Sequence, residues 1–460
     1  MRGAVIVSPH NVRTKIVRTT PEEREWLHRF LSARIGGGAR ARVVSLIDRA
    51  SDTFPTGALA PLLTAALGDG VTVEVLDRRR PPCERNRDAD LGWLRPHQRA
   101  AIERTYTRER GIWCLPTGAG KGELGPALAL TWPVHWLVLV HRRHLMEDLA
   151  GRWERRTGRP AGRIGAGVWQ PRSPYTVATM ATLRAAGRND LRVRALADVI
   201  GGVLVDECHV AAASTHREVL DYWRRAFFWY GMSGSATDRG DRADFLTLAH
   251  LGPVLLSVRP EELIDAGHLT RPRVRFLTYR HPGYPAGMVQ AWSAFYKAAI
   301  VRNAERNALV LEAVRRVPKP CMVFVDELEH GENMTFEIMA RGFSVQFARG
   351  ESTLDERRAV IRRLQAGELQ VGVASTVFNE GVDVPGLKAV VIAGGRKSTI
   401  AALQRAGRAT RLSEGKTSAL VVDINDVGHK TLREHATARR RAYLREGYET
   451  TMVDDVRALV

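Results

Sequence analysis

The stretch "LPTGAGKG" (Leu115–Gly122) joins a strand-like segment, "GIWCLP", to a helix-compatible one, "ELGPALAL". A strand, a glycine-rich loop and a helix in this order are the context in which a loop cradles nucleotide phosphates. Gly118 and Gly120 would let backbone N–H groups face the β-phosphate, and Lys121 would bring a positive charge to the β- and γ-phosphate oxygens. Only eight lysines occur in the chain, and none lies between Lys15 and Lys121, so chance is a poor explanation for this one.

The residue after Lys121 departs from the usual pattern of such loops. Ser or Thr normally stands there, and its hydroxyl helps to hold Mg²⁺. This chain has Gly122 instead. We expect a working ATPase with a raised demand for magnesium. Two alternatives stay open: an ATP-gated binding clamp with poor turnover, and a glycine-rich turn that binds no nucleotide.

A second stretch, "VLVDECH" (Val203–His209), is an apolar strand that ends in two acids. The carboxyl ends of the strands are where a parallel α/β sheet binds its ligand. Asp206 would hold Mg²⁺, largely through water, and Glu207 would orient and deprotonate the attacking water. An acidic pair after a strand is common by itself. Its place downstream of the glycine-rich loop favours the functional interpretation.

Short apolar segments alternate with helical ones around these two stretches. One series runs from about residue 90 to 255 and includes "HWLVLV", "GGVLVDE" and "FFWYGMSGS". Another starts near residue 270 and includes "CMVFVDE", "LQVGVAST" and "SALVVDI". Such alternation is typical of βαβ units whose parallel sheet is covered on both faces. We therefore predict an α/β fold with two similar parallel-sheet lobes in tandem.

The first residues predict a smaller α/β domain in front of these lobes. "VRTKIV" alternates like a strand, and Thr20 then caps a helix with Pro21 in its first turn and Glu23 completing a capping box. The polar, proline-bearing stretch "DRRRPPCERNRDAD" is typical of a linker. The predicted domains are residues 1–86, 87–255, 256–425 and 426–460, the last a basic helix.

The composition indicates a globular protein with a polyanionic partner. The 460 residues are 44% hydrophobic and carry a net charge of +19. A surplus this large favours nucleic acid, although its spread along the chain does not locate a groove. The four cysteines lack metal-ligand spacing, no apolar run has the length of a membrane span, and the first residues do not resemble a secretory signal. We expect a cytoplasmic monomer that makes no contact with a membrane.

Two later stretches add candidate polar residues. "MSGSATD" (Met232–Asp238) places Ser235 and Thr237 where they could hydrogen-bond the acidic pair, although a capping turn is the better interpretation of this stretch alone. "STVFNEGVDVPGL" follows a strand with a glycine turn, from which Asp383 could reach a ribose hydroxyl or an arginine. Neither stretch decides the function by itself.

A third later stretch, "QRAGRATR", repeats arginine at every third position. This spacing puts Arg405, Arg408 and Arg411 along one ridge of a helix. Arginine forks onto phosphate oxygens, so a second lobe with such a ridge could supply an arginine finger from the same chain. Taken alone, a solvated basic helix face explains the stretch better.

In this order across two similar lobes, the stretches resemble the motor core of superfamily-2 helicases and translocases, over about residues 90–425. In that family "PTGAGKG", "DECH", "SAT", "NEGVDVP" and "QRAGRATR" are motifs I, II, III, V and VI. "LRPHQ", "GMSGSATD" and "HATARRRAYLREGY" are similar to segments of phage UvsW-type branch-migration helicases, with XPB and RadD as further relatives. The resemblance implies two RecA-like lobes behind a small N-terminal domain that engages duplex DNA.

The resemblance also implies ATP and Mg²⁺ as cofactors and assigns roles motif by motif. Catalysis falls to a lysine, two acids, a glutamine and two arginines: Lys121, Asp206, Glu207, Gln404, Arg408 and Arg411, with Asp206 as the metal ligand. Nucleotide contacts fall to Arg95, Gln98, Pro116, Thr117, Gly118, Ala119, Gly120, Lys121, Gly122, Gly381, Asp383 and Arg405. Coupling between the sites falls to His209, Ser235 and Thr237. Candidate DNA contacts are Arg13, Lys15 and Arg18 in the first domain, His141 and Arg142 in the first lobe, and Thr376 and Asn379 in the second.

The implied activity is ATP-driven remodelling of forks and Holliday junctions in recombination, repair or replication restart, in a bacterial or phage-infected cell. Other replication or recombination proteins could be partners. RNA helicases and restriction-enzyme translocase subunits share this core. The latter often need a nuclease lysine beside two acids, and the N-terminal region has no lysine after Lys15. A basic structural DNA binder would leave the ordered set of motifs unexplained.

Overall fold

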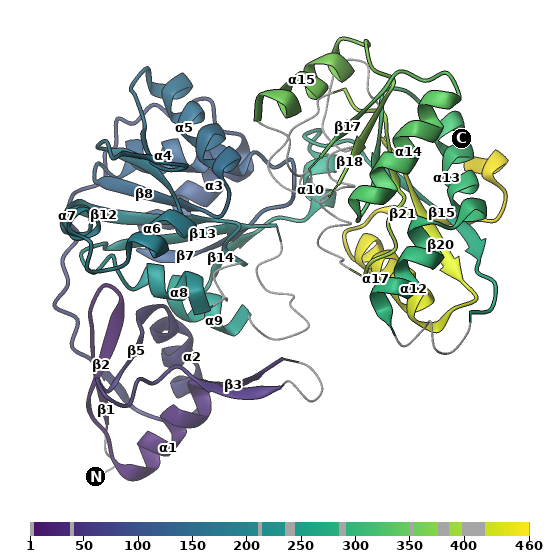
Figure 1. Cartoon of the computed structure of the whole chain (residues 1–460). Coiled ribbons are helices and arrows are strands. Elements are labelled where there is room, and N and C mark those ends of the chain that lie inside the picture. The colour runs from purple at the N-terminus through teal and green to yellow at the C-terminus, as the bar shows by residue number, and fades with distance from the viewer. Residues whose placement is uncertain are drawn as a thin grey trace. The chain divides into compact units, whose positions relative to one another are not determined.

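The computed structural model describes residues 4–36, 41–209, 214–234, 244–284, 291–349, 354–375, 386–397 and 419–459 (Figure 1). The chain divides into two compact units. The first consists of Met1–Pro116 with Gly120–Val258, and the second of Arg259–Val460 with Thr117–Ala119. Among the described residues, no helix combines the length and the apolar character needed to cross a bilayer.

A four-stranded sheet forms the N-terminal part of the first unit, in the order β5-β2-β1-β6. The predicted capping box at its first helix is confirmed: the Glu23 amide donates to the Thr20 hydroxyl at 3.3 Å, and the Thr20 amide donates to the Glu23 carboxylate at 2.8 Å. Its elements are β1 (Val5–Pro9), β2 (Arg13–Arg18), α1 (Pro21–Phe30), β5 (Thr53–Pro55), α2 (Leu59–Asp69) and β6 (Val73–Val75), with a separate hairpin of β3 (Ser32–Ile35) and β4 (Arg42–Ser45).

The first lobe is an eight-stranded sheet in the order β10-β9-β11-β8-β12-β13-β7-β14. Every pairing in it is parallel except that of β9 with β10. Every residue of three strands is buried, as expected when helices cover both faces: β7 (Arg110–Cys114), β11 (Tyr175–Thr179) and β13 (Phe228–Ser233). The others are β8 (His135–Val140), β9 (Gly162–Gly165), β10 (Val168–Gln170), β12 (Ile200–Asp206) and β14 (Val254–Ser257).

The helices of the first lobe connect its strands. They include α3 (Pro96–Glu103), α4 (Leu124–Thr131), α5 (Arg143–Thr157), α6 (Met180–Ala186), α7 (Leu191–Val199), α8 (Ser214–Leu220) and α9 (Asp244–Leu251). The helix α4 follows β7, and α5 follows β8, so both begin where a strand of the parallel sheet ends. This order places the start of each helix at the edge of the sheet where α/β proteins bind ligands.

The N-terminal domain packs directly on α9 of the first lobe. A Cβ built on Gly57 would lie 2.6 Å from both the Ala249 carbonyl oxygen and the Gly252 nitrogen, so only glycine allows this backbone contact. The buried side chain of Arg110 donates to the Asn11 carbonyl at 2.7 Å. Leu246 and Ala249 of α9 join the hydrophobic core of the small domain. The helix α9 therefore joins the core of the small domain to the first lobe.

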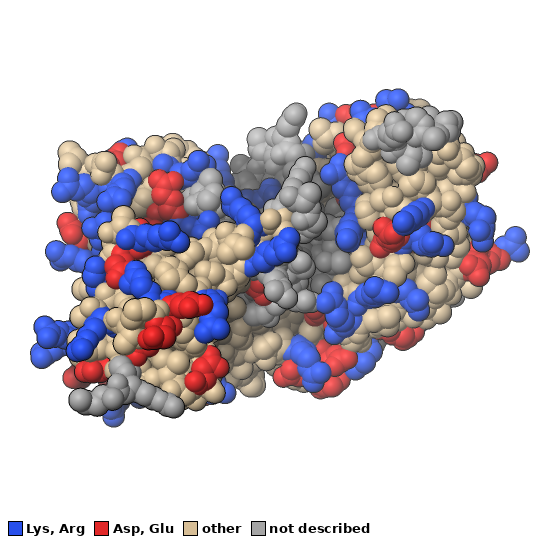
Figure 2. All heavy atoms as spheres, turned by 90° about the horizontal axis from the view of Figure 1, so that it is seen from below, with Lys and Arg blue, Asp and Glu red and all other residues tan. Residues whose placement is uncertain are grey.

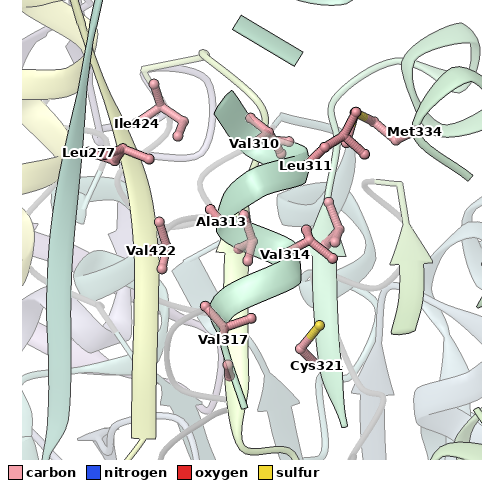
Figure 3. Packing of buried hydrophobic residues seen from close by; sticks show 14 of the residues in the cluster. Leu277, Val310, Leu311, Ala313, Val314, Val317, Cys321, Met334, Val422 and Ile424 are labelled. Atoms are coloured by element: carbon pink, nitrogen blue, oxygen red, sulfur yellow. The ribbon is translucent and has the colours of Figure 1, made fainter. Parts of the chain in front are cut away.

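The second lobe is a seven-stranded parallel sheet in the order β17-β18-β16-β19-β20-β15-β21. Figure 3 shows Val310 and Val314 of α13 (Ala304–Arg316), and Val317 directly after this helix, packed in the core with Leu277 and Val422. The strands are β15 (Pro272–Arg280), β16 (Cys321–Phe324), β17 (Val345–Ala348), β18 (Val371–Ala374), β19 (Ala389–Ile392), β20 (Ala419–Val427) and β21 (Glu449–Val453). Further helices are α10 (Pro260–Asp265), α12 (Trp292–Tyr296), α14 (Leu328–Ala340), α15 (Leu354–Gln365) and α17 (Lys430–Arg445).

The two predicted parallel-sheet lobes and the small α/β domain are confirmed, and two of the proposed domain boundaries fall inside strands. The boundary at 255/256 falls inside β14, and the boundary at 425/426 falls inside β20. The expected basic helix is present as α17, but β21 after it pairs with β15 of the second lobe. The short strand "ETTMV" has no strong periodicity of its own, and its pairing depends on β15. The division into four domains remains a proposal.

Candidate nucleotide-binding site

The glycine-rich loop lies between β7 and α4 and turns through left-handed backbone conformations. Gly118 has a φ of 89° and Gly120 a φ of 76°, values that glycine adopts without strain. A short 3₁₀ turn, Lys121–Glu123, follows and leads into α4. The loop therefore has the strand, turn and helix order that the sequence predicts. It turns where a phosphate-binding loop requires glycine.

Gln98 of α3 holds this loop from one side. Its amide nitrogen donates to the Gly120 carbonyl at 3.2 Å, and its amide oxygen accepts from the Arg95 backbone at 2.9 Å. The side chain is buried, and a Cβ on Gly120 would lie 2.4 Å from its nitrogen. Gln98, predicted as a base contact, thus also ties α3 to the loop. The Arg95 side chain is exposed.

The acidic pair lies beside the lysine, as expected from its position at the end of β12. Lys121 Nζ is 3.6 Å from Glu207 Oε1 and donates to the Leu115 carbonyl at 3.1 Å. Glu207 has a φ of 46°, which is rare outside glycine and strains the backbone locally. Its amide donates to the Asp206 carboxylate at 3.0 Å. Three residues from two distant stretches thus form one cluster.

The two carboxylates of this cluster have opposite electrostatic surroundings. Burial, together with the negative charge of Glu207, raises the pKa of Asp206. Burial also disfavours the charged form of Glu207, but the charges of Lys121 and His209 outweigh it and lower the pKa of Glu207. The pair therefore concentrates negative charge on Glu207. A cation beside Asp206 would relieve the desolvation of that carboxylate.

The donor set fits a magnesium ion that shares its ligands with phosphates. Among the described residues, no three His, Cys, Asp or Glu side chains converge as a complete metal site. Mg²⁺ usually keeps several waters and takes only one or two carboxylates alongside substrate phosphates. The buried Asp206, next to a loop shaped for phosphates, meets this description.

His209 links the acidic pair to the neighbouring strand. Its Nδ1 lies 2.9 Å from the Ser233 hydroxyl at the end of β13 and 3.3 Å from Glu207 Oε2. The histidine is buried. Ser233 escaped the sequence analysis, although it is only two residues before the predicted coupling residue Ser235. A path of polar contacts therefore runs from Glu207 through His209 to Ser233 at the end of β13.

The two predicted DNA contacts of the first lobe lie in different surroundings. The charge of His141, at the end of β8, lowers the pKa of both acids, so the histidine is near the acidic pair. Arg142, the residue before α5, is exposed. The assignment of both residues as DNA contacts stays a prediction.

The remaining site predictions in the motor core fall outside the described residues, apart from the loop and acids above. These are the residues predicted from motifs III, V and VI: Ser235, Thr237, Thr376, Asn379, Gly381, Asp383, Gln404, Arg405, Arg408 and Arg411. Their roles stay predictions that rest on the order of the motifs.

The three cations predicted to bind DNA in the first domain lie on or at the end of β2. Arg13 Nε donates to the Thr53 hydroxyl at 2.7 Å, Lys15 Nζ donates to the Ser51 carbonyl at 2.7 Å, and Arg18 is exposed. A cleft of about 980 Å³ opens beside Arg13 and Lys15. Its lining in the first lobe includes Arg188, Arg194 and Arg224, which the sequence analysis did not single out, together with Asp198, Glu218 and Asp221.

Basic side chains are not confined to that cleft. Figure 2 shows Lys and Arg scattered over both units and interspersed with Asp and Glu. The net charge of +19 therefore arises from many separate positions. The picture agrees with the expectation that charge alone does not locate a groove.

Two family models match the chain in separate segments. The model described as type III restriction enzyme, res subunit, matches residues 92–237, and the model described as helicase conserved C-terminal domain matches residues 305–413. The first segment contains the glycine-rich loop and the acidic pair. The second contains the stretches predicted as motifs V and VI.

Curated relatives are similar over most of the chain. The ATP-dependent DNA helicase uvsW of Enterobacteria phage T4 is 25% identical over 353 residues, which are 72% of this chain and 69% of that protein. The DNA 3′-5′ helicase XPB of Kineococcus radiotolerans is 23% identical over 381 residues, 80% of this chain and 66% of that protein. The chain thus spans about two thirds of each of these relatives.

Solved structures share the fold at low sequence identity. The type ISP restriction-modification enzyme LlaBIII bound to DNA has a TM-score of 0.57 at 14% identity, covering 79% of this chain and 31% of that one. S. cerevisiae Dbp5 bound to RNA and ADP BeF3 has a TM-score of 0.54 at 13% identity, covering 78% and 89%. These likenesses show the fold alone, which DNA-bound and RNA-bound proteins share. Together with the two matching family segments and the helicase relatives, the tandem RecA-like lobes establish that the chain belongs to the superfamily-2 helicases, which are ATP-dependent enzymes.

Proposed function

We propose that this protein is an ATP-driven DNA translocase that remodels branched DNA, such as Holliday junctions and stalled forks, in recombination, repair or replication restart. The observation that carries the proposal is the meeting of Lys121, Asp206 and Glu207 at a glycine-rich loop. The two relatives described above are both named as DNA helicases, which supports DNA as the partner.

The loop Pro116–Gly122 and Lys121 would hold the ATP phosphates, and Asp206 would hold Mg²⁺. When bound, the metal would neutralise charge that develops on the phosphates. Lys121 shares its charge with Glu207 at 3.6 Å, which makes Glu207 a weak base. A triphosphate at the loop offers Lys121 a stronger anion, so the pKa of Glu207 rises and its carboxylate accepts a proton from water more readily.

His209 would keep Glu207 in the orientation this step needs. Its contacts with Glu207 and Ser233 connect the acid to the end of β13, and we propose that Ser235 and Thr237 carry the signal onward. Gln404, Arg408 and Arg411 would complete the site from the second lobe, with Gly381, Asp383 and Arg405 contacting nucleotide. These roles rest on the order of the motifs.

Duplex arms would bind at the cleft beside β2. Arg13 and Lys15 line this cleft together with Arg188, Arg194 and Arg224. Its volume of about 980 Å³ is large enough for a short stretch of phosphate backbone. The acids Asp198, Glu218 and Asp221 in the same cleft limit how closely a phosphate approaches that part of its wall. Phosphate contacts of this kind would give affinity without sequence preference.

The test is strand exchange on synthetic Holliday junctions and forks with wild-type protein and Lys121→Ala. We expect ATP-dependent branch migration by the wild type and none by the variant. ATPase stimulation by branched DNA is compared with stimulation by RNA of the same length. Stimulation by RNA alone would replace the proposal with an RNA helicase.

Gly122 favours one second candidate, an ATP-gated DNA clamp. Without the hydroxyl after Lys121, the protein could bind ATP and DNA yet turn over poorly. Steady-state hydrolysis in the presence of branched DNA separates the two functions. A clamp would show nucleotide-dependent DNA binding with no hydrolysis at any magnesium concentration.

A further inference from the structure

We propose that Gly122 and Arg152 form a matched pair. The Arg152 side chain occupies the space that a Ser or Thr side chain at position 122 would need, and it acts as a positioning residue that fixes the turn after Lys121. This inference rests on the proposed ATP site. It assigns a role to a residue of α5 that lies thirty positions from Gly122 in the sequence.

The space beside Gly122 is already filled. A Cβ built on this residue would lie 2.7 Å from both Cδ and Nε of Arg152, and 3.1 Å from a methyl carbon of Leu149. Real Cβ atoms essentially never approach other heavy atoms within 3.0 Å. Ser and Thr both carry a Cβ, so neither fits unless the Arg152 side chain moves.

Glycine is needed here for space and not for backbone conformation. Gly118 and Gly120 have positive φ angles, whereas Gly122 is not among the glycines with positive φ. An L-residue at position 122 would therefore suffer no backbone strain. The obstacles are the Arg152 side chain, which crosses over it, and to a lesser degree the Leu149 methyl group.

Arg152 is held in place by carboxylates on both sides. Its Nε donates to Asp148 at 3.0 Å, and its Nη1 donates to Glu123 at 3.0 Å. Glu123 also accepts from Arg156 Nε at 2.7 Å. The Arg152 side chain is 27% exposed and that of Glu123 is 15% exposed. Moving Arg152 to admit a Cβ would therefore break or distort two partly buried ion pairs.

These ion pairs bind α5 to the first turn after the loop. Glu123 is the last residue of the turn that contains Lys121, so fixing Glu123 restrains the lysine two residues earlier. Arg156 lies 5.3 Å over the ring of Trp93, which precedes the "LRPHQ" stretch. Gln98 holds Gly120 from that same stretch. The loop is thus restrained at Gly120 and again at Glu123.

The matched pair predicts a different effect on the ATP site when a hydroxyl side chain is introduced at position 122. If Gly122 were simply a lost magnesium ligand, Gly122→Ser would improve the site. In the matched pair, Gly122→Ser displaces Arg152 and removes one of the two arginines that hold Glu123, so it harms the site unless Arg152 is shortened as well. The two interpretations therefore predict opposite signs for one substitution.

The experiment is a double-mutant cycle of wild type, Gly122→Ser, Arg152→Ala and the double variant, with Arg155→Ala on the same helix as a matched control. The first readout is Tm without nucleotide. We expect Gly122→Ser to lower Tm by about 2–4 °C when Arg152 is present. In the Arg152→Ala background the same substitution should lower it by clearly less.

The second readout separates positioning from simple packing. We expect Gly122→Ser to raise the KM for MgATP about tenfold with a smaller change in kcat, and the double variant to recover part of that loss with a lower magnesium requirement. Arg152→Lys keeps the charge but loses the fork, and it should behave like Arg152→Ala. Arg155→Ala should match wild type in both readouts.

The proposal is overturned if the effects of the two substitutions on Tm and on the KM for MgATP are additive. It is also overturned if Gly122→Ser, with Arg152 intact, has a Tm and a KM for MgATP as good as those of wild type or better. Failure of the proposed function looks different, because wild-type protein would then hydrolyse no ATP with any nucleic acid. In that case the Tm cycle, together with binding of a fluorescent ATP analogue in Mg²⁺, still decides the inference.

Discussion

Both lobes bury aspartates on central strands, but the charges that surround them differ. In the second lobe, Asp426 of β20 accepts from Arg306 Nε at 2.7 Å and Nη2 at 3.0 Å, and lies 2.9 Å from His281 Nε2. In the first lobe, Asp206 is followed by a second carboxylate, Glu207, and the nearby lysine Lys121 pairs with that second acid.

The difference appears in the two pKa values. Burial disfavours the charged form of both acids. At Asp426, Arg306 and His281 outweigh it and lower the pKa to about 2. At Asp206, burial and the charge of Glu207 act in the same direction and raise the pKa. The buried charges of the second lobe are satisfied within the protein and support the fold. We propose that Asp206 of the first lobe is arranged for a cation that comes from outside.

The strongest test of this contrast is Glu207→Gln. Removing a general base costs about 10²–10⁴-fold in rate, so we expect kcat to fall by that factor while Tm stays close to wild type. The measurement is steady-state ATPase with branched DNA. Glu103→Gln, on the exposed part of α3, is the control. An unchanged kcat would remove Glu207 from the proposed mechanism.

The opposite behaviour is expected at the satisfied acid. Arg306→Met leaves Asp426 buried without its main partner, and breaking such a pair costs about 3–5 kcal/mol of unfolding free energy. Chemical denaturation measures this loss. The double variant Arg306→Met with Asp426→Leu should recover much of it, because no lone charge remains. If the single and the double variant have the same free energy of unfolding, the ion pair does not account for the stability of this region.

Asp206→Asn should stabilise the protein in the absence of nucleotide and magnesium. A carboxyl whose folded pKa is raised favours folding below its unfolded pKa of about 3.9, and that contribution is lost as the pH rises through the folded pKa. We therefore expect the variant to exceed wild type by roughly 1 kcal/mol at pH 8, with no advantage at pH 4. Denaturation at both pH values is the check, and equal stability at pH 8 would contradict the raised pKa.

Asp426 supplies the matched case with the opposite sign. Its lowered pKa contributes stability above the unfolded value, and that contribution is lost only as the pH falls through the folded pKa. The measurement is the free energy of unfolding of wild-type protein as a function of pH. If the contribution of Asp426 to this free energy is lost well above pH 4, the contrast between the lobes is wrong.

The smallest expected effect concerns arginines on the surface. Arg306 is fully buried, whereas Arg188 and Arg194 are exposed at the cleft. Arg188→Gln with Arg194→Gln should leave Tm unchanged and reduce the slope of log K against log salt for duplex DNA by about 1 for each phosphate that is no longer neutralised. Arg159→Gln, exposed elsewhere on the first lobe, is the control. An unchanged slope would remove the cleft from the DNA path.

Local patterns were enough to predict much of the fold. The capping box at Thr20 involves residues three apart, and strands such as β7, β8 and β12 are apolar over most of their length because both faces of the sheet are covered. The strands that escaped prediction include β15 and β21, which mix polar and apolar residues. Only their pairing with β20 and with each other defines them.

The site shows the same division. Lys121, Asp206 and Glu207 could be expected to meet, because the carboxyl ends of parallel strands share one edge of a sheet. Three features of the site could not be predicted. They are the position of His141 near the acids, the role of Ser233, and the contact of Arg152 with Gly122. Each of these depends on side chains from separate elements packing at one place.

By itself, the amino-acid sequence determined many of the strands and helices, the glycine-rich turn and the acids that accompany it, because these depend on periodicity and on residues close together in the chain. Only the tertiary structure decided which buried charges are neutralised inside the protein and which side chain fills the space beside Gly122. Burial, pKa and free space at a residue are set by neighbours that are distant in the sequence.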